Sequence, residues 1–106
     1  MKEAIHKLSQ DGLVAVLYSP GFGAGWSTWN REYPQLVFDP AIVKYVEKDA
    51  KEKLAEYMAL KYPDAYTGGM DDLTVAWIPE GTAFRITEYD GSESIEVMTE
   101  VDWLIA

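Results

Sequence analysis

One hexapeptide constrains the fold of this chain more than any other segment. Leu13–Tyr18 reads LVAVLY and is apolar at both odd and even positions. Successive side chains of a strand point to opposite faces of a sheet, so a strand that is apolar at every position is covered on both sides. The hexapeptide is therefore predicted to be the central strand of a sheet and the middle of the hydrophobic core.

A helix is expected from Pro40 to about Tyr62. Asp39 followed by Pro40 is typical of a helix start, with Asp39 as the N-cap and Pro40 at the first helical position. Pro63 ends the segment, and a break is expected near residues 47–49. Apolar side chains recur on one side of this helix, which predicts that it packs against a sheet.

Shorter elements are expected on both sides of this helix. The first ten residues suit a short helix that ends at Asp11–Gly12, and residues 35–38 suit a second short strand. Turn signals separate the later strand candidates and predict a meander of antiparallel hairpins. These later candidates are residues 73–78, 82–89, 93–98 and 101–105.

Together the elements predict a single α+β domain over residues 1–106. Its mainly antiparallel sheet of four to five strands carries one long helix, with a break, on one face, and a short N-terminal helix accompanies it. One helix covers one face. The other face is expected to be polar, or to be buried by the loop after the first strand or by another subunit, and a homo-oligomer with a dimer favoured follows from the last option.

Charge is distributed unevenly along the chain. Eighteen acidic and nine basic residues give a formal net charge of -9. The acidic excess lies in residues 63–106, a segment in which Arg85 is the sole basic residue. Such a chain is not expected to bind a nucleic acid duplex or an anionic membrane, because both need clustered Lys and Arg. The absence of cysteine and of any long apolar run predicts a cytoplasmic protein.

The uncharged segment from Pro20 to Asn30 carries the predicted binding site. Its glycines permit positive φ and close approach of a ligand, and its backbone amides suit an anion. Its aromatic rings suit a base or a sugar, and arginines just after it and in a later strand suit a phosphate. The predicted ligand-binding residues are Gly21, Phe22, Gly23, Gly25, Trp26, Ser27, Thr28, Trp29, Asn30, Arg31 and Arg85.

Two structural alternatives compete with this interpretation. Trp26 and Trp29 suit a plug over the open face of the sheet, with the glycines shaping the turn. Arg85 lies in a predicted strand, and this position favours a cross-strand ion pair over a contact with a ligand. Substitution of either arginine would separate the two interpretations.

Catalytic and metal-binding chemistry finds little support in the sequence. The histidine His6 has no recognisable catalytic partner, and there is no cysteine nucleophile. The spacing of several C-terminal carboxylates does not match a calcium-binding loop. These carboxylates are Asp71, Asp72, Glu88, Asp90 and Glu93. No catalytic residue, metal or cofactor is assigned, and binding is favoured over catalysis.

The segments LYSPGFGAGWSTWN, KYPDAYTGG and LTVAWIPEGTAFRITEYDGSESI resemble a family of small, acidic, largely uncharacterised proteins of phages and bacteria. The resemblance covers most of residues 13–98 and transfers no site. It implies a coherent domain and, for a viral member, a place in the host-cell cytoplasm.

Small phage proteins without enzymatic features often disarm host defence, and this analogy offers two functions. One is sequestration of a small nucleotide-derived ligand such as an immune signal, which the glycine-aromatic loop favours. The alternative is an acidic protein-interaction or DNA-mimic inhibitor of a host protein, acting through the carboxylates of residues 64–102.

Overall fold

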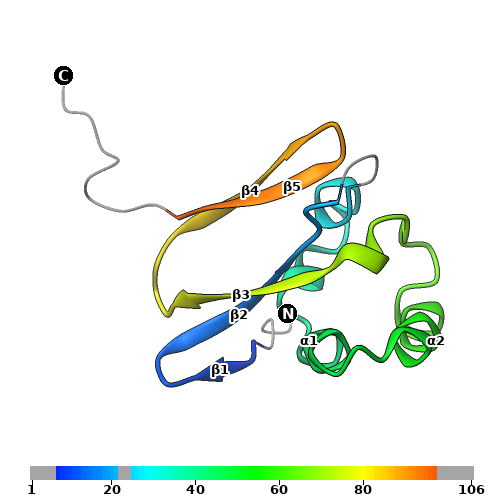
Figure 1. Cartoon of the computed structure of the whole chain (residues 1–106), viewed down its shortest axis with the longest axis horizontal. Helices are drawn as coiled ribbons and strands as arrows, with labels where there is room; N and C mark the ends of the chain where they lie inside the picture. The colour runs from blue at the N-terminus through cyan, green and yellow to red at the C-terminus, as the bar shows by residue number, and fades with distance from the viewer. Residues whose placement is uncertain (1–6, 22–24, 98–106) are drawn as a thin grey trace, which may run out of the picture.

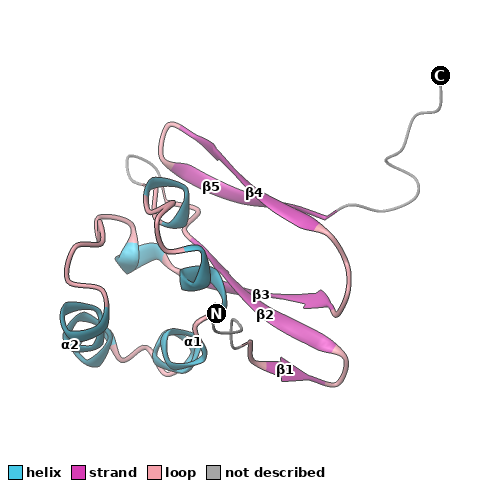
Figure 2. Ribbon diagram, turned by 180° about the vertical axis from the view of Figure 1, so that it is seen from behind, coloured by secondary structure: helices cyan, strands magenta, loops and turns pink. Residues whose placement is uncertain are grey.

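The computed structural model describes residues 7–21 and 25–97, and within them five strands form two separate antiparallel sheets (Figure 1). The larger sheet has the order β1-β2-β3, with bounds Ser9–Gln10, Leu13–Tyr18 and Thr74–Pro79. The smaller sheet is a hairpin of β4, Phe84–Tyr89, and β5, Ser92–Val97. Two α-helices lie together beside the larger sheet, which Figure 2 shows from behind. The predicted α+β class is confirmed.

β2 is the central strand, as predicted. It pairs with β1 at Leu13 and Val14 on one edge and with β3 along its whole length on the other edge. Leu17 faces the main core, and Val16, on the opposite face, is buried as completely. Both faces are therefore covered within one chain. The burial of this strand gives no argument for a second subunit, and the homo-oligomer stays a prediction.

The chain around Asp11–Gly12 forms a hairpin. Both residues have positive φ, 54° and 78°, which is the backbone of a tight two-residue turn between antiparallel strands. The helix expected in the first ten residues is wrong for Ser9–Gln10, which pair with β2 as β1. Residues 1–6 of that prediction lie outside the described residues. The apolar pattern there was too short to decide between helix and strand, whereas the turn residues decide it.

The predicted helix is divided at the expected place. α1 spans Pro40–Glu47 and α2 spans Lys51–Lys61. Asp49 takes a left-handed φ of 53°, its amide bonds to Val46 O, and the next amide bonds to Tyr45 O, which is the hydrogen-bond pattern of a Schellman helix end. The single long helix on one face is not confirmed, because α1 contacts β2 and β3 while α2 packs against α1. No helix of the described segments is long and apolar enough to cross a membrane.

The strand predicted at residues 35–38 is wrong. Pro34–Phe38 form the 3₁₀ helix η2, with Pro34 at its first position. Proline lacks the amide that a strand needs for its ladder and has a φ suited to the first turn of a helix. Leu36 is fully buried, whereas its neighbours on either side are half-buried, so the apolar run has one buried residue and not a buried face.

The three predicted C-terminal strands exist as β3, β4 and β5, but the meander is wrong. β3 pairs with β2, and β4 pairs with β5 through a turn at Asp90–Gly91 whose φ values are both positive. Residues 80–83 connect the two sheets, and the amide of Glu80 bonds back to Gly12 O at 2.9 Å. A turn signal shows that the chain reverses without showing which strands pair. The candidate strand at 101–105 lies outside the described residues.

One hydrophobic core joins these elements. It combines the inward side of β2 with η2, both α-helices and the loop that follows β2. Its buried members are Ala15, Leu17, Trp26, Leu36, Ile42, Val43, Leu54, Met58, Tyr62 and Leu73. The glycine-aromatic loop is therefore packed into the body of the protein at Trp26, and this contact fixes where the rest of the loop lies.

Candidate functional site

The glycine-aromatic loop is held by one buried carboxylate, that of Glu93 at the start of β5. Glu93 Oε2 accepts hydrogen bonds from the amides of Trp26 (2.8 Å) and Thr28 (3.0 Å) and from Thr28 Oγ1 (2.7 Å). Its Oε1 accepts from the amide of Ser19 at 2.9 Å, and its own amide donates to Ser19 O at 2.8 Å. Glu93 is 1% exposed. The loop amides thus converge on an anion, and that anion belongs to the protein.

This role was not predicted for Glu93. From the sequence, Glu93 was one of several carboxylates with little support as a cation site. In the structure, both of its oxygens accept hydrogen bonds from the loop. The described residues contain no group of three potential metal-ligating side chains. Ser19 and Glu93 are far apart in the sequence, so no local pattern could join them.

The two tryptophans of the loop have different environments. Trp26 is completely buried in the core, as the plug alternative predicted, and its ring offers no face to a ligand. Its indole nitrogen has no hydrogen-bond partner among the described residues. Trp29 ends the 3₁₀ helix η1, Ser27–Trp29, and is 44% exposed. A stacking role remains open for Trp29 alone.

Asn30 closes the loop onto the segment after α2. Its Nδ2 donates to Trp26 O and to Tyr66 O, and its Oδ1 accepts from the amide of Tyr66 at 2.7 Å. Asn30 is 2% exposed, so its amide group is fully used within the protein. Its position was predicted to be functional, and its contacts make it a structural residue that places Tyr66 next to Trp29.

A groove of about 460 Å³ opens between η1, η2 and β4. Both arginines of the sequence, Arg31 and Arg85, line it. Predicted site residues that also line it are Ser27, Thr28 and Asn30. The hydroxyl of Thr28 already donates to Glu93, so Ser27 supplies the hydroxyl without a side-chain partner among the described residues. The structure therefore brings two cations and a hydroxyl to one concave surface.

The remaining lining of the groove was not predicted. It is made by Tyr33, Pro34, Val37, Phe84 and Ile86. Pro34 and Val37 belong to η2, and Tyr33 directly precedes it. Phe84 and Ile86 belong to β4, whose neighbour in space could not be known from the sequence. Tyr33 and Phe84 provide the aromatic surface of the groove, whereas the prediction placed it at Phe22, Trp26 and Trp29.

Other predicted site residues lie outside the groove. Gly21 is half-buried, and its backbone passes against the carboxylate of Asp72 so closely that a Cβ would meet it. Gly25 is buried under the ring of Trp29. Phe22 and Gly23 lie outside the described residues. Gly21 and Gly25 thus make room for side chains of the protein itself.

Arg85 forms the cross-strand pair that its position predicted. It lies opposite Glu96 in the β4–β5 register, and its Nε donates to Glu96 Oε2 at 2.5 Å. Both side chains are more than half exposed, and ion pairs of this kind contribute little to stability. A guanidinium has five N–H donors in a plane, so this pair leaves most of them for another anion. The guanidinium of Arg31 makes one weak hydrogen bond among the described residues, from Nε to Thr28 O at 3.3 Å.

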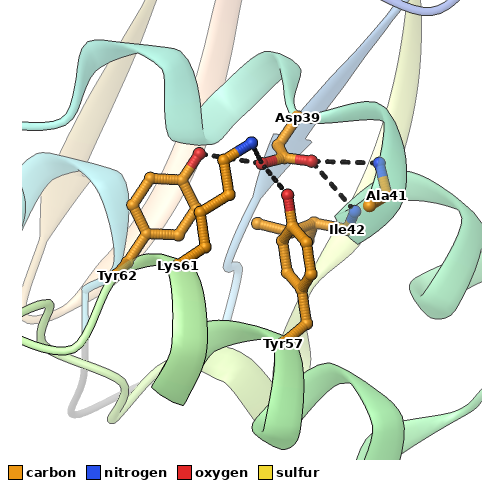
Figure 3. Close-up of polar contacts among 6 residues, drawn as sticks. All are labelled: Asp39, Ala41, Ile42, Tyr57, Lys61 and Tyr62. Carbon is orange, nitrogen blue, oxygen red and sulfur yellow. Dashed lines mark hydrogen bonds and ion pairs between the residues drawn. The ribbon is translucent and has the colours of Figure 1, made fainter.

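A second polar cluster, outside the groove, joins the two α-helices (Figure 3). Asp39 Oδ1 caps α1 by accepting from the amides of Ala41 (3.0 Å) and Ile42 (3.4 Å), as the sequence predicted. Its Oδ2 accepts from the hydroxyls of Tyr57 (2.7 Å) and Tyr62 (2.8 Å) and pairs with Lys61 Nζ at 3.3 Å. One carboxylate therefore holds the start of α1 against the end of α2.

Burial and hydrogen bonding act in opposite directions on this cluster. Burial raises the pKa of Asp39, but hydrogen bonds from Tyr57 and Tyr62 and the charge of Lys61 outweigh it, so the pKa lies below its usual 3.8. Burial, followed by the bond to Asp39 and its charge, raises the pKa of Tyr62 above its usual 10.0. The folded state thus favours a charged Asp39 beside a neutral Tyr62.

These shifts predict how stability changes with pH. A lowered carboxyl pKa stabilises the folded state above about pH 4, and this contribution is lost as the pH falls through the folded-state pKa. A raised tyrosine pKa stabilises it below about pH 10, and this contribution is lost as the pH rises further. Urea unfolding of the wild type, Asp39→Asn and Tyr62→Phe measures both. The wild type and Asp39→Asn should differ less in their free energy of unfolding in acid than at neutral pH. The wild type and Tyr62→Phe should differ less in alkali than at neutral pH. Differences in free energy of unfolding that do not change with pH would contradict the prediction.

No protein-family model matches the chain, no curated protein matches it in sequence, and no solved structure matches it.

Proposed function

We propose that this chain is a non-enzymatic binding protein that sequesters a small nucleotide-derived ligand in the groove between η1, η2 and β4. The observation that supports it most is the placement of Arg31 and Arg85 on one concave surface. Two guanidinium groups are suited to phosphate oxygens, which the surrounding carboxylates would otherwise repel. A host immune signal of phosphorylated nucleoside chemistry fits both this groove and the resemblance to phage proteins.

The rest of the groove suits the other parts of such a ligand. Tyr33 and Phe84 line it with aromatic surface for a base, and Ser27 offers a hydroxyl for a sugar or phosphate oxygen. Phe84 packs edge-on against Phe38, with ring centroids 5.9 Å apart, and Tyr33 packs edge-on against Tyr62 at 5.3 Å. Both rings are therefore supported from behind before a ligand arrives. In this proposal the base stacks on these two rings and not on Trp26 or Trp29.

The two arginine variants test the proposal with matched controls. Titration of AMP, ADP and cyclic dinucleotides into the protein, followed by calorimetry, should identify a nucleotide that binds. Arg31→Gln and Arg85→Gln should each weaken its affinity about 10- to 100-fold, because each removes charged hydrogen bonds of about 1.5–3 kcal/mol. Lys48→Gln removes an exposed cation from outside the groove and should leave the affinity unchanged.

Glu96→Gln separates the two roles of Arg85. It breaks the cross-strand ion pair but keeps the guanidinium, so it should retain nucleotide affinity while Arg85→Gln loses it. If both variants retain full affinity, Arg85 is a structural residue and the groove is not a phosphate site. Native mass spectrometry of protein purified from a cell extract gives an independent readout, because a retained mass of nucleotide size identifies the ligand class directly.

A further inference from the structure

Trp29 and Tyr66 form an exposed aromatic pair outside the groove. Their ring centroids are 5.0 Å apart with planes at 47°, and the residues are 44% and 42% exposed. Neither residue lines the groove. Trp and Tyr are among the residue types most enriched at the centres of protein interfaces. Their rings give a large contact area for few rotatable bonds.

The pair is rigidly held from three sides. Trp29 Nε1 donates to Glu88 Oε1 at 2.7 Å, and Asn30 bonds both the amide and the carbonyl of Tyr66. A Cβ on Gly25 would meet the Trp29 indole, and a Cβ on Gly68 would meet the Tyr66 hydroxyl. Two glycines thus leave space for rings that lie against the backbone. Rings fixed in this way lose little conformational freedom when a partner binds.

One carboxylate contacts the pair, and others lie near Tyr66 along the chain. Glu88 is exposed and is fixed against the indole nitrogen, and the loop that carries Tyr66 also carries exposed carboxylates. These are Asp64, Asp71 and Asp72. The faces of indole and phenol rings attract cations, and a guanidinium both stacks on such rings and pairs with a carboxylate. The chemistry of the patch is therefore complementary to arginine.

We propose that Trp29, Tyr66 and Glu88 form a docking point for an arginine-bearing segment of a partner protein. The guanidinium stacks on the aromatic pair and pairs with Glu88, while the net charge of -9 attracts the surrounding basic surface. This interaction is separate from the nucleotide groove and does not depend on it. In this proposal a partner is held by specific contacts at these three residues and not only by the negative charge of the chain.

A short peptide in which arginine and glycine alternate is the probe, with calorimetry as the readout. Tyr66→Ala should weaken its binding about tenfold, which corresponds to about 1.4 kcal/mol. Tyr89→Ala is the matched control, because Tyr89 is an exposed tyrosine on β4 with 77% exposure and should leave the affinity unchanged. Glu88→Gln keeps an oxygen for the indole and removes the charge, so it should also weaken binding. The same peptide made with lysine should bind more weakly than the arginine peptide.

Three outcomes would overturn the proposal. These are no binding at millimolar peptide, equal losses in Tyr66→Ala and Tyr89→Ala, and equal affinity for the lysine peptide. Equal losses in the two tyrosine variants would show that the Trp29–Tyr66 pair is not the specific contact. Equal affinity for the lysine peptide would show that the peptide is held by overall charge. Circular dichroism of each variant confirms that it is folded. Arg31→Gln should leave peptide binding intact, so failure of the nucleotide site and failure of this surface are distinguishable.

Discussion

Glu93→Gln should destabilise the protein by about 2–4 kcal/mol, a large share of the stability of a domain of this size. An amide has one acceptor oxygen and one NH₂ group, whereas the carboxylate accepts from the amides of Ser19, Trp26 and Thr28. In either orientation of the amide, a buried NH₂ faces at least one backbone N–H. Each buried donor without an acceptor costs about 1–3 kcal/mol, and charge-assisted bonds to the loop are lost in addition.

Chemical unfolding followed by circular dichroism measures this loss, with Glu80→Gln as the matched control. Glu80 is an exposed glutamate whose side chain has no hydrogen-bond partner among the described residues, so its variant should stay within about 0.5 kcal/mol of the wild type. Hydrogen exchange at Trp26 and Thr28 should quicken in Glu93→Gln. Equal stability of the two variants would show that the carboxylate does not hold the loop.

Asp39→Ala should produce a loss of about 3–4 kcal/mol. An N-cap contributes about 1 kcal/mol, and the buried hydroxyl of Tyr62 and the half-buried hydroxyl of Tyr57 lose a charged acceptor at about 1.5–3 kcal/mol each, with partial relief from water. Tyr33, which lines the groove, packs on Tyr62, so the groove should also lose definition. The loss extends from a helix start to the proposed binding surface.

Two further variants separate the contributions to this effect. Asp39→Asn keeps the capping oxygen and should lose about half as much, because asparagine caps helices as well as aspartate. Asp64→Ala removes an exposed aspartate and should change the free energy of unfolding by less than about 0.5 kcal/mol. Equal losses in Asp39→Ala and Asp39→Asn would show that the cap contributes nothing and that the tyrosine contacts carry the whole effect.

Local signals in the sequence predicted local structure well. Asp39–Pro40 marked the start of α1, the break near residues 47–49 was confirmed, and the uniformly apolar Leu13–Tyr18 became the central strand. Each of these features depends on residues that are adjacent along the chain. The strand assigned to residues 35–38 failed because a short apolar run suits a strand and a 3₁₀ helix equally, and only Pro34 separated them.

Pairings between distant segments could not be predicted in the same way. β3 pairs with β2 and leaves β4 unpaired on that side, because the connection through residues 80–83 carries the chain to another sheet. Glu93 belonged to an acidic run and gave no sign that it enters the protein. Arg31 and Arg85 were named as possible phosphate ligands, with an ion pair as the competing role of Arg85. The structure shows that pair and also places both arginines on one groove.

Because the carboxylate of Glu93 binds the loop amides, the loop keeps its shape without a bound ligand. Where loop amides close around a bound phosphate, the ligand completes the fold of its own site, and a change of ligand requires a change of loop. Here the amides of Trp26 and Thr28 already donate to Glu93. The groove residues Ser27, Arg31 and Arg85 are therefore carried by backbone whose conformation does not depend on a ligand. Substitutions at those three positions should therefore change the surface of the groove, and with it the selectivity of the proposed site, while the loop stays folded.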